Sequence, residues 1–309
     1  MKKHISVVLL FITALIWGAA FAAQKAATSV PPFALGAARS AIATVILAPI
    51  AMLFDKFSKN KRNLFSFKKG EKTMDITHRE LIGGVVCGIF LFVASTLQQT
   101  GMTVGTDAGK ASFITALYVV AVPFFALVFR RKSPINAWIG VAVSVIGFYL
   151  LCIKENFTIA TSDLLIFFAA LAFAAQIIAI DSFLPDCDGV RLSLIQFATV
   201  GALSFVCSLI FEGAGSFASV TLCIPEILFL GIGSSGIAYT LQIIGQKGVK
   251  PAAASIILSL ESVFGALAGA LILKETMSPR EYIGCAVVFL AVILSQTDFK
   301  ALLQKNAQT

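Results

Sequence analysis

One acidic residue stands in the middle of a long apolar stretch near the C-terminus. Glu261 lies ten residues into the run 251–273, which is long enough to cross a bilayer. An ionised carboxylate at that depth costs at least about 2.5 kcal/mol, so such a residue usually faces a cavity. Glu261 could bind a substrate amine or a coupling proton, or it could pin its helix against a neighbour. We favour the first role.

Three basic residues also fall inside or at the ends of apolar runs. Arg39 lies about 10 Å inside its run at 1.5 Å per residue, and Lys25 and Lys110 enter their runs from the same side. Together they could attract a carboxylate or a phosphate. Long basic side chains can instead extend to the membrane surface, and Arg39 could form a structural ion pair. We favour the structural interpretation for the three together, and keep Arg39 and Lys110 as candidate substrate contacts.

Neutral polar and aromatic residues supply the remaining candidates for a binding site. Gln98, Gln242 and Tyr239 lie in apolar runs, where they could hydrogen-bond a substrate. They could equally hold helices together, which is a common use of polar groups in lipid. Trp17 and Tyr118 could form an aromatic wall of a cavity, although core packing explains them as well.

Two residues of opposite charge occupy matching places in the two halves of the chain. Asp181 follows Lys25 by 156 residues, the offset that also aligns the first apolar run with the sixth. Charges at symmetric places could act as gate contacts on the two membrane faces. For Asp181 an interfacial position at a helix end is the simpler interpretation.

Several chemistries lack the residues they need. The only histidines, His4 and His78, lie at the terminus and between apolar runs, so we expect no histidine-based metal or acid–base centre in the membrane. There is no phosphate-binding GxxxxGK[ST] sequence, which disfavours ATP-driven pumping by this chain. No nucleophile–base pair is evident. We therefore expect no cofactor, no metal and no enzymatic activity.

The composition places these residues in a membrane. Of the 309 residues, 58% are hydrophobic and only 13% are charged, whereas soluble domains carry about 25% charged residues. The net charge is +8, but the basic residues cluster between apolar runs and form no basic helix face of the kind that binds nucleic acid. The basic excess is therefore interpreted as a signal of membrane orientation, and lipid is the expected environment.

The apolar runs predict ten membrane-spanning helices, which we number as spans 1–10. A spanning helix needs about 20 mainly apolar residues. The ten segments are 5–27, 33–54, 81–101, 106–129, 135–153, 163–183, 192–211, 224–245, 251–273 and 281–297. The first could be a cleavable signal peptide, but it resembles the sixth, with Trp17 opposite Phe173. We therefore expect it to be retained.

The lysines and arginines predict how the helices are oriented. If both termini are cytoplasmic, 18 of the 24 basic residues fall in cytoplasmic segments, as the positive-inside rule requires. Eight of them lie in one long segment from Asp55 to Arg79, which we expect to be a solvated hairpin. The predicted location is a bacterial inner membrane.

A repeated motif divides the chain into two halves. Thr96-Leu97-Gln98 followed by Gly101 recurs 144 residues later as Thr240-Leu241-Gln242 followed by Gly245. The copies lie on spans 3 and 8, five spans apart, so they must cross the membrane in opposite directions. We therefore predict an all-α membrane protein with two inverted five-helix units, 1–153 and 154–300, and a cytoplasmic tail at 301–309. Inverted repeats are how many secondary transporters alternate access.

At this point several short motifs resemble the EamA family of the drug/metabolite transporter superfamily. They are Trp17-Gly18-x-x-Phe21, Ala38-Arg39, Gly109 to Phe113, Tyr118 to Pro123, Leu258 to Phe264, Leu273-Lys274-Glu275 and Ile283-Gly284. Their order covers nearly the whole chain. The resemblance implies a ten-helix bundle whose central cavity is lined mainly by spans 1, 3, 4, 6, 8 and 9. Two positions depart from the family pattern: Ser262 replaces the usual proline after Glu261, and Arg130-Arg131-Lys132 replaces an acidic residue after span 4.

The resemblance and the inverted repeat together predict a secondary transporter that exports a small metabolite. The expected substrate is an amino acid or a related amine or acid, bound near the midplane, with a proton as a coupling partner. A multidrug or cation exporter of the same fold is one alternative. An intramembrane lipid-modifying enzyme is another, disfavoured by the lack of a histidine or a carboxylate pair in the membrane.

Overall fold

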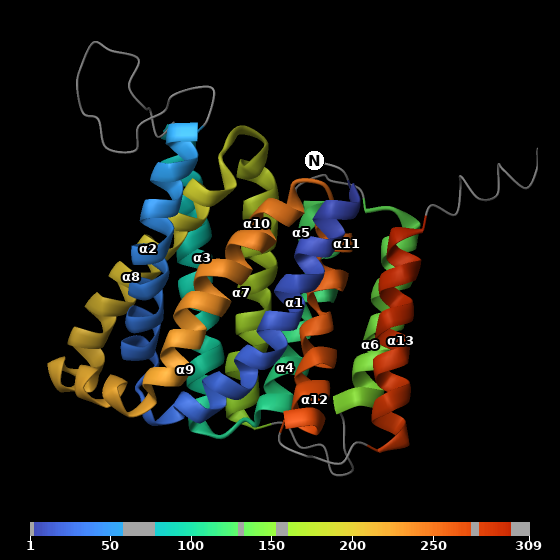
Figure 1. Ribbon diagram of the computed structural model, residues 1–309. Helices are drawn as coiled ribbons and strands as arrows, with labels where there is room; N and C mark the ends of the chain where they lie inside the picture. The colour runs from blue at the N-terminus through green and yellow to red at the C-terminus, as the bar shows by residue number, and fades with distance from the viewer. Residues whose placement is uncertain (1–2, 58–77, 129–132, 153–159, 273–277, 298–309) are drawn as a thin grey trace, which may run out of the picture.

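The structure, a computed structural model, is a bundle of helices (Figure 1). It describes residues 3–57, 78–128, 133–152, 160–272 and 278–297. The α-helices are α1 Lys3–Ala26, α2 Pro32–Phe57, α3 His78–Val104, α4 Ala108–Ala116, α5 Tyr118–Val128, α6 Ile135–Cys152, α7 Thr161–Phe183, α8 Gly189–Cys207, α9 Ile224–Leu228, α10 Tyr239–Gln246, α11 Pro251–Leu258, α12 Leu260–Ile272 and α13 Pro279–Gln296. Short 3-10 segments occupy Ala27–Ser29, Leu184–Asp186 and Ala214–Cys223, and π-helical segments occupy Ser208–Glu212 (η3) and Phe229–Ala238 (η5).

The predicted all-α membrane fold is confirmed. Among the described residues, nine helices are long and apolar enough to cross a membrane, and the shorter apolar helix Ile135–Leu151 supplies one more. Each of the ten predicted spans coincides with one of them. α1 begins and α13 ends at the same end of the bundle, here called the N-terminal end (Figure 1). The predicted hairpin from Asp55 to Arg79 falls mostly outside the described residues, as do the tail at 301–309 and Arg130-Arg131-Lys132.

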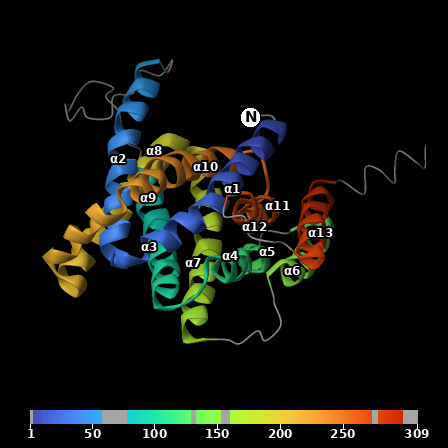
Figure 2. The same ribbon diagram turned by 60° about the horizontal axis from the view of Figure 1, so that its bottom comes forward.

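The two halves of the chain make matching contacts. α3 packs against α7 and α8, and the corresponding span of the second half, formed by η5 and α10, packs against α1 and α2. α1 packs against α12, as α7 packs against α4 and α5. α6 and α13, the fifth helix of each half, pair with each other at one edge of the bundle (Figures 1 and 2). α3 and α10, which carry the repeated motif, run in opposite directions (Figure 1).

Three spans that the sequence predicts as continuous are locally irregular. Span 4 is interrupted at Leu117, between α4 and α5, and span 9 at Ser259, between α11 and α12. Span 8 contains the π-helical segment η5. Its three glycines lower helix propensity, and π segments often mark functional sites. These irregular segments adjoin the central cavity described below.

A glycine allows the closest helix approach near that cavity. A Cβ added to Gly18 of α1 would lie 2.6 Å from Cβ of Phe264 and 2.7 Å from the backbone nitrogen of Gly265, both on α12. Only glycine therefore lets α1 and α12 meet at this distance. The contact holds the first turn of α12, which carries Glu261, against α1.

Candidate functional site

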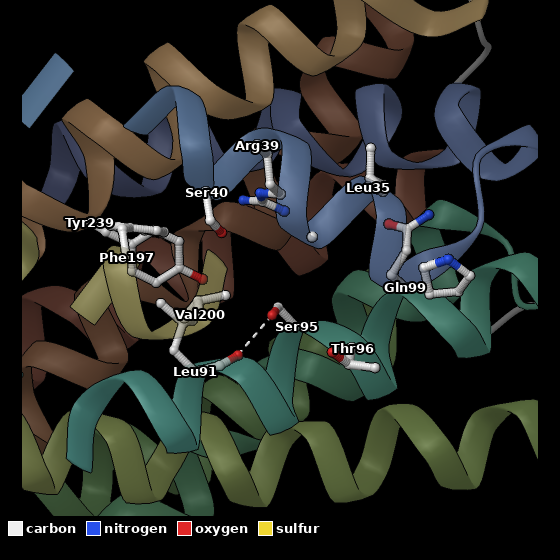
Figure 3. A pocket seen from close by; sticks show the side chains of 12 residues that line it. Leu35, Arg39, Ser40, Leu91, Ser95, Thr96, Gln99, Phe197, Val200 and Tyr239 are labelled. Carbon is white, nitrogen blue, oxygen red and sulfur yellow. Dashed lines mark hydrogen bonds between the residues drawn. The ribbon is translucent and has the colours of Figure 1, made fainter. Parts of the chain in front are cut away.

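Two adjoining pockets form one central cavity. They share Arg39, Ser95 and Tyr239. In the first pocket, Arg39 of α2 and Ser95 of α3 face each other across the space, with Tyr239 at one side (Figure 3). The second pocket is lined by residues of nine helical segments, namely Trp17, Ala20, Phe21, Gln24, Arg39, Ser95, Gln98, Thr115, Tyr118, Phe173, Ser234, Tyr239 and Glu261.

Arg39 is buried in the cavity wall, and none of the acidic residues that the structure describes pairs with it. Its side chain is 9% exposed. It donates from Nε to Ser235 Oγ at 2.9 Å and from Nη2 to Ser234 Oγ at 3.2 Å, with a longer contact of 3.5 Å to Oε1 of Gln24. Each of these acceptors is neutral. The hydroxyls position the guanidinium while its positive charge remains uncompensated by any described carboxylate.

Glu261 is buried in the same cavity and is also uncompensated. It is 4% exposed, and Oε1 has no hydrogen-bond partner among the described residues. The interruption at Ser259 places Glu261 in the first turn of α12, where the helix dipole favours an anion. Ser262 Oγ donates to the carbonyl of Ser112 at 2.9 Å and ties this turn to α4. The backbone thus holds the carboxyl group in place beside the hydroxyl of Tyr118, and Oε1 is left for a further partner.

Aromatic rings line the same cavity as the two charged residues. The rings of Trp17 and Tyr239 are 4.5 Å apart between centroids, and Phe197 meets Tyr239 at 5.4 Å. Within the described part of the chain Nε1 of Trp17 is buried without a hydrogen-bond partner, and the hydroxyl of Tyr118 lies beside the carboxyl group of Glu261. A buried polar atom left unpaired costs about 1–3 kcal/mol. The cavity therefore combines apolar ring faces with donors and acceptors that a bound molecule or water can satisfy.

Not every predicted site residue lies in this cavity. Trp17, Tyr118, Gln98, Tyr239, Arg39 and Glu261 all line it. Gln98 donates to the hydroxyl of Thr115 at 2.9 Å, so its amide nitrogen is already occupied. Gln242 lines neither pocket, and instead donates to Oε1 of Gln176 at 3.2 Å.

The predicted cations Lys25 and Lys110 lie outside the cavity, at the end of the bundle opposite the N-terminal end. Lys110 pairs with the 5%-exposed carboxylate of Asp163, which also accepts from Thr106 and from the backbone of Ala160. Lys25 donates to the carbonyls of Met102 and Thr106. These contacts join α1, α3, α4 and α7.

Asp181 lies at the N-terminal end, in a third pocket with Gln246, Lys247 and Lys250. It is therefore far from Lys25, as the predicted gate arrangement requires. That Lys25 and Asp181 act as gate contacts stays a prediction.

Sequence reasoning missed the partners that make the site. Ser234 and Ser235 look like spacer residues between glycines, yet they hold Arg39. Asp163 lies at the start of an apolar run and holds Lys110. Arg191 is 3% exposed and pairs with the fully buried Glu80 at 3.6 Å. The only sequence signal for these ion pairs is that each charged residue stands alone beside an apolar run.

Among the described residues no group of three or more histidines, cysteines or acids is placed to hold a metal ion. The cavity likewise presents no lysine or cysteine for covalent attachment of a cofactor. What the arrangement can do is bind a small molecule with both charged and apolar parts.

Comparison with known proteins agrees with this architecture. The model of the EamA-like transporter family matches the chain twice, at residues 4–153 and 160–297. An uncharacterised transporter from Archaeoglobus fulgidus is 31% identical over 287 residues, covering 92% of this chain and 83% of that protein. The uncharacterised inner membrane transporter YedA from Escherichia coli K12 is 24% identical, over 92% of this chain and 88% of that protein.

A solved crystal structure shares the fold. It aligns over all of both chains with a TM-score of 0.71 at 18% sequence identity. The duplicated family match, the apolar helices and the transporter relatives together identify a multi-pass membrane transporter of the drug/metabolite type, and the chain belongs to the EamA-like transporter family.

Proposed function

We propose that this transporter exports a small zwitterionic metabolite, such as an amino acid or a related compound. The observation that carries the proposal is the pair of uncompensated charges in one cavity. Arg39 presents a guanidinium held by neutral hydroxyls, and Glu261 presents a carboxyl group whose Oε1 is unpaired. A substrate carboxylate would meet the first and a substrate amine the second.

The aromatic residues add a place for the substrate's apolar part. Trp17, Tyr239 and Phe173 supply ring faces in the same cavity. A ring face also attracts a cationic amine, by about 0.5–2 kcal/mol. An amino acid with an apolar side chain would therefore satisfy every kind of group that the cavity presents.

Transport would follow from the matching halves of the chain. The units 1–153 and 154–300 would rock about the central cavity and expose it to each membrane face in turn. Towards the N-terminal end the cavity is bounded by an apolar cluster that includes Val122, Ile177, Leu194 and Ile257. If this cluster closes the cavity towards the N-terminal end while the cavity opens to the other membrane face, solvent would not pass through the protein.

A proton is the coupling partner that fits Glu261. A buried carboxylate without a cation is costly, so the empty carrier would return with Glu261 protonated. Substrate binding would release that proton, because the substrate amine would take its place. This exchange of an inward proton for an outward amine corresponds to export.

Efflux of lipophilic cations is the second candidate. The unpaired Glu261 among aromatic rings favours it, because such a site would also bind an organic cation. The buried charge of Arg39 opposes it, since a cation lacking a carboxylate would leave the guanidinium uncompensated and add a second positive charge.

Thermal unfolding of the purified protein with matched ligands separates the two candidates. The panel comprises amino acids, the amines that lack only the carboxylate, and the acids that lack only the amine. A zwitterion at 100 times its Kd should stabilise the protein by about 2.7 kcal/mol, whereas the matched amine and acid should have little effect. Stabilisation by the amines alone would favour cation efflux. A response to none of the amino acids would contradict the proposed substrate class, and hits would then be tested for flux in proteoliposomes.

A further inference from the structure

Two helices, α7 and α10, run from the central cavity to the third pocket. Each carries a glutamine at a position between the cavity and that pocket. On α7, Phe173 lines the cavity and Asp181 lines the third pocket, with Gln176 between them. On α10, Tyr239 lines the cavity and Gln246 lines the third pocket. Gln242 lies between them, three residues after Tyr239, as Gln176 lies three residues after Phe173. The distance from Tyr239 to Gln246 is about 10 Å at 1.5 Å per residue.

These glutamines touch across the helices and form a chain. Gln242 Nε2 donates to Gln176 Oε1 at 3.2 Å, and Gln176 Nε2 donates to Gln196 Oε1 of α8 at 3.1 Å. The three side chains are 1%, 0% and 0% exposed. The chain of amides thus crosses the bundle beside the apolar cluster that closes the cavity.

The chain leaves polar atoms unsatisfied. Oε1 of Gln242, Nε2 of Gln196 and both amide atoms of Gln246 are buried, and no residue in the described ranges forms a hydrogen bond with them. Each such atom costs about 1–3 kcal/mol if it stays dry. Buried waters typically make about three hydrogen bonds to such groups. Dry packing of these amides would therefore be expensive, and water between them relieves the cost.

We propose that the glutamine-bearing faces of α7 and α10 line a narrow water-filled path that connects the central cavity to the third pocket at the N-terminal end. Amide groups orient water without ionising, so the path conducts protons between that end and Glu261 while the apolar cluster beside it stays closed to the larger solute. Its role as a proton route rests on the proposed function; its hydration does not.

Charged groups stand at both ends of the path. At the cavity end these are Arg39 and Glu261, with the phenols of Tyr118 and Tyr239. At the other end Asp181, Lys247 and Lys250 line the third pocket, and the Glu80–Arg191 pair connects α3 and α8 at the same end of the bundle. None of the three glutamines carries charge, so the middle of the path holds no fixed ion to trap a proton.

Silver ions test the hydration directly, because Ag⁺ is about the size of a water molecule and reacts with thiols that water can reach. The full-length chain, with its six cysteines replaced by serine or alanine, receives one cysteine at a time, Gln242→Cys or Gln176→Cys. The control is Ile243→Cys, which is also fully buried but packs in an apolar cluster with Ile180 and Leu192. Each variant is placed in nanodiscs in chloride-free buffer, exposed to Ag⁺, and the remaining thiols are titrated after denaturation.

We expect the cysteines of Gln242→Cys and Gln176→Cys to react with Ag⁺ at least about tenfold faster than the cysteine of Ile243→Cys. Adding Gln246→Leu to Gln242→Cys should slow the reaction of that cysteine, because leucine would block the way from the third pocket. Equal rates at Gln242→Cys and Ile243→Cys would show that the amides only hold helices together and would overturn the path. A fast reaction untouched by Gln246→Leu would overturn the connection to the third pocket. Size-exclusion profiles and thermal unfolding confirm that each variant is folded.

The assay needs no substrate, so its outcome is separate from that of the proposed function. A dry path with an intact amino-acid response would remove the proton route alone. A wet path in a protein whose thermal stability ignores amino acids would remove the proposed substrate class alone.

Discussion

Arg39 of α2 and Glu261 of α12 line one buried cavity, and neither forms an ion pair within the part of the chain that the structure describes. The two residues are 222 positions apart and belong to different halves of the chain. Arg39 donates its hydrogen bonds to Ser234 and Ser235, and Glu261 shares the cavity with the rings of Trp17 and Tyr239.

Replacing the buried acid should remove binding without harming the fold. Glu261→Gln keeps the size and shape of the buried side chain and removes its ability to ionise, so we expect unchanged or higher thermal stability. Affinity for an amino acid identified by thermal unfolding should fall at least about 30-fold, since losing a buried charge contact costs about 2–5 kcal/mol. Isothermal titration measures the affinity. Glu226→Gln, in the first turn of α9 and outside the cavity, is the control, and equal affinities in both variants would contradict the role of Glu261.

Replacing the buried arginine should discriminate between ligands. Arg39→Gln keeps a polar side chain beside Ser234 and Ser235 but removes the charge that would meet a carboxylate. Binding of an amino acid should weaken by about 2 kcal/mol or more, whereas binding of the matched amine should be unchanged or stronger. Competition binding with both ligands gives the ratio. An equal loss for the two ligands would mean that Arg39 acts only through the structure.

The Lys110–Asp163 pair should affect stability and leave binding intact, because both residues lie outside the cavity. Asp163→Ala removes the acceptor for Lys110, Thr106 and the backbone of Ala160, so unfolding should become easier by at least about 1–3 kcal/mol. Asp107→Ala, whose side chain is 89% exposed, is the matched acidic control. Thermal unfolding and ligand titration are measured together, and a loss of affinity larger than the loss of stability would place the pair in the binding machinery.

The close contact of α1 with α12 predicts a steric effect at Gly18. Gly18→Ala should destabilise the protein by about 1–3 kcal/mol, because overpacking forces the helices apart. It should also weaken ligand binding, since Glu261 lies at the start of α12. Gly109→Ala, in α4 with open space around its Cβ position, should be neutral or stabilising. Equal thermal unfolding of the two variants would contradict the packing argument.

The distribution of lysine and arginine predicts which face each loop occupies. A green fluorescent protein fused after Thr309 should fluoresce, because both termini are expected in the cytoplasm. In a chain without its native cysteines, a cysteine introduced at Asp107, at the opposite end of the bundle and 89% exposed, should react with an impermeant maleimide added outside intact cells. A fluorescent C-terminal fusion whose position-107 cysteine reacts only after lysis would overturn this orientation.

The sequence by itself determined the helices and their directions. An apolar run of about 20 residues forms a spanning α-helix in a bilayer, because lipid offers no partner for the backbone groups and the helix hydrogen-bonds them internally. The repeated Thr-Leu-Gln…Gly motif and an odd number of spans between its copies made the two halves run in opposite directions. A charge at the centre of an apolar run is costly wherever it lies, so Glu261 was recognisable as a candidate before any contact was known.

Only the tertiary structure decided which candidates meet. Arg39 and Lys110 have the same charge and similar depths in their runs, but Arg39 enters the cavity while Lys110 is bound to Asp163. Gln98 and Gln242 are repeat-mates, yet one lines the cavity and the other belongs to the glutamine chain. The direction in which a side chain points depends on helix rotation and on small interruptions such as those at Leu117 and Ser259. Contacts between distant segments set those features, and no local pattern in the sequence records them.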